Sequence, residues 1–128
     1  MVHLTELAKR LLDGKNFPCV ATLMPDGSPQ VAPVWVERDG DIVVINATVK
    51  RQRYLNLKRD KRVAITVFDM ADPYTRVMIR GRTVEITTNG AEDHIDKLSM
   101  KYRGRKYDFH RPDEPRVIMR IQPEHVTD

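Results

Sequence analysis

The chain has 128 residues and a net charge of +4, with 41% hydrophobic and 31% charged residues, proportions typical of a folded globular domain rather than a disordered chain. A single cysteine, Cys19, excludes an internal disulfide framework, and no stretch approaches the ~18 apolar residues that a membrane helix requires. The start of the sequence does not resemble a leader peptide, so we expect one domain over residues 1–128 in a reducing, cytoplasmic compartment.

The first half of the chain predicts a short helix followed by strands. Leucines recur at helical spacing over residues 4–13, and Gly14 follows as a C-terminal cap. Extended runs cover residues 17–24, 29–37 and 41–46, with turn sequences at 25–28 and 39–40. This order predicts an antiparallel meander. Both faces of the first run are largely apolar, so we expect helices or a partner subunit to cover both sides of the sheet.

The second half alternates helices with strands. Helices are expected over residues 50–59 and 89–102, and strands over 62–68, 75–87 and 115–121. A loop is expected at 69–74, and Gly81 indicates a bulge or a barrel corner. The fold class is therefore mostly antiparallel β with flanking helices.

The segment with the clearest chemical meaning is the start of the helix at residues 50–59. Its first turn holds Lys50, Arg51 and Arg53 and no acid, although the positive end of the helix dipole favours acidic residues there. A bound phosphate would make this arrangement favourable, because the helix dipole, the free N–H groups and the guanidinium groups would all interact with one anion. Asn46 and Thr48, just before the helix, carry side chains that can also bond a phosphate. A solvated cationic helix face is the alternative.

A second clue is Pro33 inside the run 29–37. Proline cannot donate to a strand ladder, so the backbone beside Val34 and Trp35 is predicted to open toward a planar ligand. An edge strand with Trp35 in the core is the equally weighted alternative.

Other motifs are weaker. The four histidines share no metal-ligand spacing and are expected at the surface or at caps, and no metal site is expected. Cys19 is expected in the core. No glycine-rich dinucleotide fingerprint or phosphate-binding P-loop is present in the sequence. Residues 101–107 mix cations with tyrosines, which fits a solvated loop, contact with an acidic cofactor tail, or nucleic-acid binding.

Several segments together resemble a known family. They are ATLMPDGSPQVAPVWV, the R-x-R-x-x-N-L pattern over residues 51–57, DPYTRVMIRGRTVEI, KLSMKYRGRKY and EPRVIMRIQPEHV. The pattern resembles the pyridoxamine 5′-phosphate oxidase-like superfamily, whose fold is the FMN-binding split β-barrel, and within it the branch of F420-dependent oxidoreductases. Arg53 replaces the lysine that is more common in the family, which keeps the charge and changes its geometry.

The resemblance implies a homodimer with cofactor sites at the subunit interface. It implies that Arg51 and Arg53 bind the phosphate, that Asn46, Ala47 and Thr48 line it, and that Pro33, Val34 and Trp35 back the ring. Tyr74 and Arg76 match positions that reach the cofactor from the other subunit.

The expected function is therefore an oxidoreductase that uses coenzyme F420, with FMN as second choice, on a small organic substrate. No catalytic residue is predicted; Tyr74, Tyr102 and Tyr107 are candidate proton donors, but a structural role is favoured for each. The alternatives are a non-catalytic carrier or sensor of the same cofactors and, more distantly, a basic nucleic-acid-binding barrel. Neither membrane nor nucleic-acid partners are expected.

Overall fold

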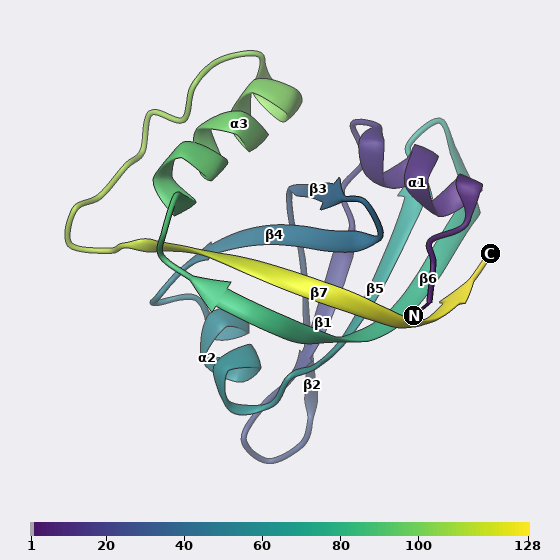
Figure 1. Ribbon diagram of the computed structural model, residues 1–128, viewed down its shortest axis with the longest axis horizontal. Helices are drawn as coiled ribbons and strands as arrows, with labels where there is room; N and C mark the ends of the chain where they lie inside the picture. Colours follow the sequence, from purple (N-terminus) through teal and green to yellow (C-terminus); the bar gives the residue numbers. More distant parts are fainter. Residues whose placement is uncertain (1) are drawn as a thin grey trace.

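The computed structural model describes residues 2–128, which form three helices and one seven-stranded sheet (Figure 1). The elements in chain order are α1 (Glu6–Asp13), β1 (Cys19–Leu23), β2 (Pro29–Pro33), β3 (Val36–Asp39), β4 (Ile42–Thr48), α2 (Gln52–Arg59), β5 (Arg62–Asp69), β6 (Asp72–Thr87), α3 (Ala91–Arg103) and β7 (Arg116–Thr127). The strand order is β2-β1-β5-β6-β7-β4-β3, and all neighbours are antiparallel. The predicted class, mostly antiparallel β with flanking helices, is confirmed.

The predicted strand over residues 29–37 is in fact two strands, and the predicted meander is wrong at this point. β2 ends at Pro33 and β3 begins at Val36, and these strands form opposite edges of the sheet. Pro33 has no N–H to donate, and the N–H of Val34 donates to the carbonyl oxygen of Pro18 at 2.9 Å. The chain then leaves the first edge, so that residues 34–35 cross from one edge of the sheet to the other.

β6 and β7 are both longer than the sequence predicts. The expected loop at 69–74 is a tight turn, so β6 already begins at Asp72, and β7 continues six residues beyond the predicted end at residue 121. The register shifts between Arg80 and Gly81, which confirms the predicted bulge. A methyl group on Gly81 would overlap the carbonyl oxygen of Gln122 on β7. Glycine therefore permits the close approach that bends these two long strands.

The helices cover the sheet at separate places (Figure 1), with α1 and α3 above its two ends and α2 beside β1. Thr5 caps α1 through its side chain, and α3 buries one side that includes Ile95, Leu98 and Tyr102. The core lies inside the bent sheet; its largest fully buried side chains are Leu11, Leu12, Ile45, Leu57, Ile79, Leu98, Met119 and Ile121. Across residues 2–128, none of the helices combines the length and apolarity needed to span a bilayer.

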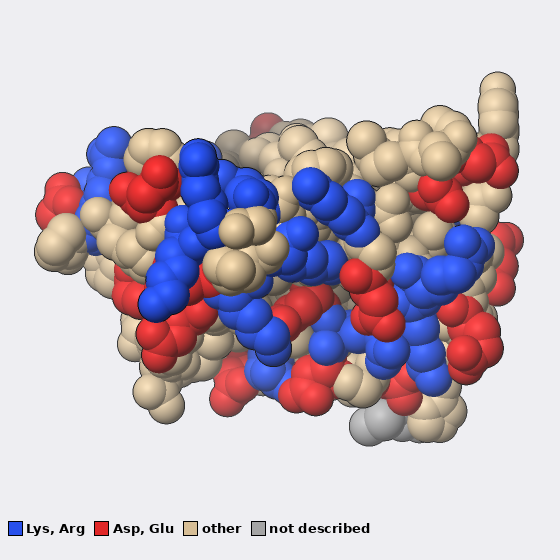
Figure 2. All heavy atoms as spheres, turned by 90° about the horizontal axis from the view of Figure 1, so that it is seen from above, with Lys and Arg blue, Asp and Glu red and all other residues tan. Residues whose placement is uncertain are grey.

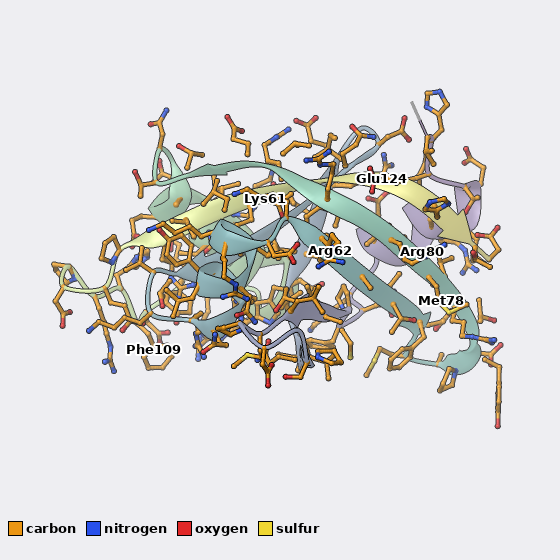
Figure 3. All side chains as sticks on the ribbon, turned by 90° about the horizontal axis from the view of Figure 1, so that it is seen from below. Lys61, Arg62, Met78, Arg80, Phe109 and Glu124 are labelled. Carbon is orange, nitrogen blue, oxygen red and sulfur yellow. The ribbon has the colours of Figure 1, made fainter. Side chains whose placement is uncertain are left out.

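One face of the sheet remains open. Val31 on β2 is 64% exposed and Met78 on β6 is 44% exposed. With Cys19, Ala21 and other residues of β1, β5 and β6 they line a shallow, mostly apolar hollow of about 390 Å³. Figure 3 shows Met78 and Arg80 along β6 on this underside. Here the apolar second face predicted for β1 has no cover among residues 2–128.

Candidate functional site

A cavity of about 340 Å³ opens where the end of β2, the crossing segment, the start of α2 and the inner side of α3 meet. It brings together six of the ten predicted site residues. Its lining consists of Phe17, Pro33, Val34, Trp35, Asn46, Arg51, Arg53, Ile95, Leu98, Tyr107 and Arg116. The lining is apolar on one side and cationic on the other, a division that suits a ligand with a ring and an anionic group.

The apolar side is an aromatic stack. Trp35 lies parallel to Tyr102, with ring centroids 5.4 Å apart and an interplanar angle of 7°, and Phe17 lies 5.1 Å from Tyr102. The Tyr102 hydroxyl donates to the carbonyl oxygen of Asn16 at 2.5 Å and accepts from the N–H of Val36 at 3.3 Å. Burial raises the pKa of Tyr102 to about 12. Tyr102 is thus a structural residue that fixes the Trp35 ring.

The cationic side contains Arg51, Arg53 and Arg116. Nη2 of Arg53 donates to the carbonyl oxygen of Asn46 at 2.7 Å, whereas its buried Nε has no partner among the described residues. Burial, reinforced by the charges of Arg51 and Arg116, lowers the pKa of Arg53 to about 10. Within residues 2–128 none of the three guanidinium groups forms an ion pair. Three converging cations without a carboxylate are unfavourable unless an anion joins them.

The start of α2 has the predicted electrostatics. Arg51 is the N-cap residue and makes no capping bond with its side chain, and the first turn holds no acid. In contrast, α1 and α3 both carry acidic residues in the first turn. The positive end of the α2 dipole therefore faces further positive charge instead of the usual carboxylate.

The last residues of the R-x-R-x-x-N-L pattern orient its arginines. Asn56 and Leu57 are completely buried, and Nδ2 of Asn56 donates to Oγ1 of Thr22 on β1 at 2.9 Å. This contact fixes one side of α2 against the sheet. Arg51 and Arg53 lie earlier on the helix and line the cavity.

Sequence reasoning missed Arg116 and the role of Tyr107. Arg116 pairs with Thr48 in the β4–β7 register. Nη1 of Arg116 donates to Oδ1 of Asn46 at 3.1 Å, and Nη2 donates to the Tyr107 hydroxyl at 2.8 Å. The guanidinium carbon also lies 4.6 Å from the centre of the Tyr107 ring. No local sequence signal marks Arg116, because only strand pairing brings it to the cavity.

His94 is the other missed residue. Its expected surface position is wrong: it is 7% exposed and lies 3.0 Å from Nδ2 of Asn46. Its place on the buried stripe of α3, one residue before Ile95, is the signal that indicates burial.

A second hollow of about 360 Å³ adjoins the cavity and shares Arg51, Tyr107 and Arg116 with it. Its remaining lining residues are Thr48, Phe109, Arg111 and Glu114. Thr48 donates its hydroxyl to Oε1 of Glu114 at 2.5 Å. Three cations against one acid leave this second hollow positively charged.

The other predicted site residues lie elsewhere. Ala47 is fully buried and lines neither hollow. Tyr74, which is 89% exposed, and Arg76 lie near the β5–β6 turn, which Figure 1 shows beside α1 and away from α3. Lys101 donates to the carbonyl oxygens of Leu12 and Val36 at 2.7 Å each, so part of the basic stretch 101–107 is structural. No cluster of three or more potential metal ligands occurs within residues 2–128.

Comparison with known proteins supports the fold. A family model described as pyridoxamine 5′-phosphate oxidase matches residues 4–128. The solved structure of an F420 reductase is 31% identical, with a TM-score of 0.87, and the match covers 97% of this chain and 98% of that one. A search of curated proteins found no match.

Two more distant structures share the fold. A conserved hypothetical protein from Mycobacterium tuberculosis is 23% identical, with a TM-score of 0.73, over 96% of this chain and 82% of that one. HupZ from Group A Streptococcus is 21% identical, with a TM-score of 0.71, over 96% of this chain and 91% of that one. The expected split barrel is confirmed.

Proposed function

The chain belongs to the pyridoxamine 5′-phosphate oxidase family, and from this membership we propose that it is an oxidoreductase that binds coenzyme F420. FMN is the second choice. The proposed reaction moves a hydride, or electrons with FMN, between the bound cofactor and a small organic substrate. The similarity to an F420 reductase across nearly the whole chain supports this choice of cofactor.

The observation that carries the proposal is the set of unpaired guanidinium groups beside an aromatic wall. Arg53 is partly buried, its Nε has no hydrogen-bond partner among the described residues, and its surroundings lower the pKa of the guanidinium to about 10. A phosphate fits this end of the cavity, because it supplies the missing negative charge and several acceptors for guanidinium donors. A flat ring system fits the other end, against Trp35 and the crossing segment.

When bound, the cofactor supplies the redox chemistry. The chain's own residues bind and orient it: Arg51, Arg53 and Arg116 hold the phosphate, and Trp35, fixed by Tyr102, backs the ring. Pro33 and Val34 complete the wall of the ring pocket. The side chain of Asn46 orients the Arg116 guanidinium group, and Thr48 and Ala47 support the turn from β4 into α2. Ile95 and Leu98 exclude water from the inner side.

The second hollow supports F420 over FMN. The hollow begins at Arg51 and Arg116, where the phosphate is proposed to lie, and continues to Arg111. FMN ends at its phosphate, whereas F420 continues into a side chain that carries carboxylates. A positively charged extension of the site therefore suits the longer, more acidic ligand.

We further propose a homodimer built on the open face of β2, β1, β5 and β6. Val31 and Met78 are exposed there beside a mostly apolar hollow, and a second copy of the same face would bury both. The exposed Tyr74 and Arg76 are proposed to reach the cofactor of the partner subunit. They have no role in the cavity of their own chain.

A carrier or sensor of the same cofactor is the second candidate function. Its support is the lining of the cavity, where Tyr107 is the one titratable hydroxyl among the described residues and no carboxylate is present. A nucleic-acid-binding barrel is disfavoured, because acidic side chains interrupt the basic ones over the face seen in Figure 2. A phosphate backbone would need a continuous basic path.

The test is a fluorescence titration of the purified protein with F420 and with FMN. The Arg51→Ala, Arg53→Ala double variant is expected to bind at least tenfold more weakly, since charge-assisted hydrogen bonds contribute about 1.5–3 kcal/mol each. Lys50→Ala is the matched control, because Lys50 is an exposed cation that does not line the cavity. Unchanged affinity in the double variant would contradict the phosphate site, and tight binding without turnover would select the carrier.

A further inference from the structure

The Asn46 side chain lies at the centre of a buried hydrogen-bond network whose direction is determined by its partners. Nδ2 donates to the carbonyl oxygen of Ala91 at 3.0 Å, and Oδ1 accepts from Nη1 of Arg116 at 3.1 Å. The amide orientation is therefore fixed, because a carbonyl oxygen needs a donor and a guanidinium needs an acceptor. The second N–H of Asn46 must then point to Nδ1 of His94, 3.0 Å away.

This direction determines the tautomer of His94. Since Nδ1 accepts a hydrogen bond, the ring proton of the neutral imidazole resides on Nε2. Nε2 lies 3.1 Å from Oε1 of Glu37, although the N–H is not well aligned with that oxygen. Glu37 is held in turn by Lys97, whose Nζ lies 3.1 Å from its other oxygen. The network thus runs from the edge strand β3 through α3 to the cavity.

At the cavity the network ends on Arg116. Besides Asn46, the guanidinium contacts the hydroxyl and ring of Tyr107, so that two residues determine its position. Without the acceptor at His94, the Asn46 amide loses one of the bonds that define its orientation. A rotated amide would present N–H groups to the Arg116 guanidinium, which has no acceptor to offer.

We infer that His94 is a positioning residue: through Asn46, it holds Arg116 in the orientation that meets an anion at the cationic side of the cavity. The inference rests on the proposed phosphate site. It differs from a simple packing role for a buried histidine, because packing requires the volume of the ring and does not require an acceptor at Nδ1. The two roles therefore respond differently to substitution.

The test compares two variants with two probes. His94→Leu keeps apolar volume and removes the acceptor, while His94→Asn retains an oxygen at the branch position that Nδ1 occupies. The probes are F420 and the same deazaflavin with its ribityl chain and no phosphate. We expect His94→Leu to weaken F420 binding about tenfold and to leave the affinity for the phosphate-free probe unchanged. His94→Asn is expected to restore the wild-type ratio of the two affinities. His3→Leu, at an exposed position outside the cavity, is the control.

The outcomes separate the two proposals. A wild-type protein that binds both probes equally would overturn the phosphate site and the inference with it. A wild-type preference for F420 that His94→Leu leaves intact, or that His94→Asn fails to restore, would overturn the role of His94 alone. If His94→Leu does not fold, nitrogen NMR of the wild-type ring decides: protonation on Nε2 with Nδ1 as acceptor supports the network, and protonation on Nδ1 contradicts it.

Discussion

The substitution Arg53→Met is expected to change stability and cofactor affinity in opposite directions. Burial, together with the charges of Arg51 and Arg116, lowers the pKa of Arg53 from its usual range to about 10. A lowered pKa in a base means that folding disfavours the charged form, and this cost persists at any pH below about 10. At about 1.4 kcal/mol per pH unit, the charge costs the folded, ligand-free protein roughly 3 kcal/mol.

Methionine removes that charge while filling similar apolar volume. The variant also loses the hydrogen bond to the Asn46 carbonyl oxygen, which offsets about 1 kcal/mol of the stability gained by removing the charge. We therefore expect the free energy of unfolding of the ligand-free protein to rise by about 2 kcal/mol, and Tm by about 8 °C. F420 affinity is expected to fall at least tenfold, since one charge-assisted contact with the phosphate is lost.

The assay is thermal unfolding of the wild type and the variant, each with and without saturating F420. Arg53→Met is expected to melt higher without ligand and to gain less Tm from F420 than the wild type does. Lys50 is an exposed residue just before α2, and Lys50→Met is expected to change neither the Tm without ligand nor the gain in Tm from F420 appreciably. A variant that melts lower without ligand and binds F420 as tightly as the wild type would refute the reasoning about buried, unpaired charge.

Three further predictions concern the fold, its pH dependence and its assembly. Gly81→Ala is expected to lower the free energy of unfolding in urea by about 3 kcal/mol, because the methyl group overlaps a carbonyl oxygen of β7; an unchanged midpoint would show that β6 and β7 can separate freely. His94, and secondarily Lys97, lowers the pKa of Glu37 to about 2. The charged Glu37 carboxylate therefore stabilises the fold above about pH 4.5, and this stabilisation is lost as the pH falls toward 2. Glu37→Gln should therefore flatten the acid limb of a pH–stability curve, and an identical acid limb would contradict the contact. Met78→Asp is expected to convert the proposed dimer to a monomer in light scattering, while Met100→Asp, an equally exposed position on α3, leaves the mass unchanged; a dimer that survives Met78→Asp would place the interface elsewhere.

The part of the site that the sequence predicts is the part determined by local chemistry. Arg51 and Arg53 stand out because cations at a helix start conflict with the dipole of the same helix, and this conflict needs no knowledge of the tertiary structure. Pro33 likewise signals a break in the ladder through its own missing N–H. Apolar residues on both faces of β1 predict two covered faces, one of which is open among residues 2–128.

The remainder depends on tertiary pairing. Residues 29–37 read as one strand because nothing local shows that β2 and β3 belong to opposite edges of the sheet. Arg116 enters the cavity because β7 pairs with β4 in a register that places it opposite Thr48. His94 is buried because α3 packs over Asn46, which lies 48 residues earlier in the chain. Such contacts require the strand order and register, which no single segment encodes.

The most direct test of the phosphate site is a crystal structure of the protein with F420. We expect density for the phosphorus among the guanidinium groups of Arg51, Arg53 and Arg116, with the deazaflavin ring against Trp35. A phosphate in bulk solvent, or bound at another surface while these three arginines remain unpaired, would contradict the proposed cofactor site.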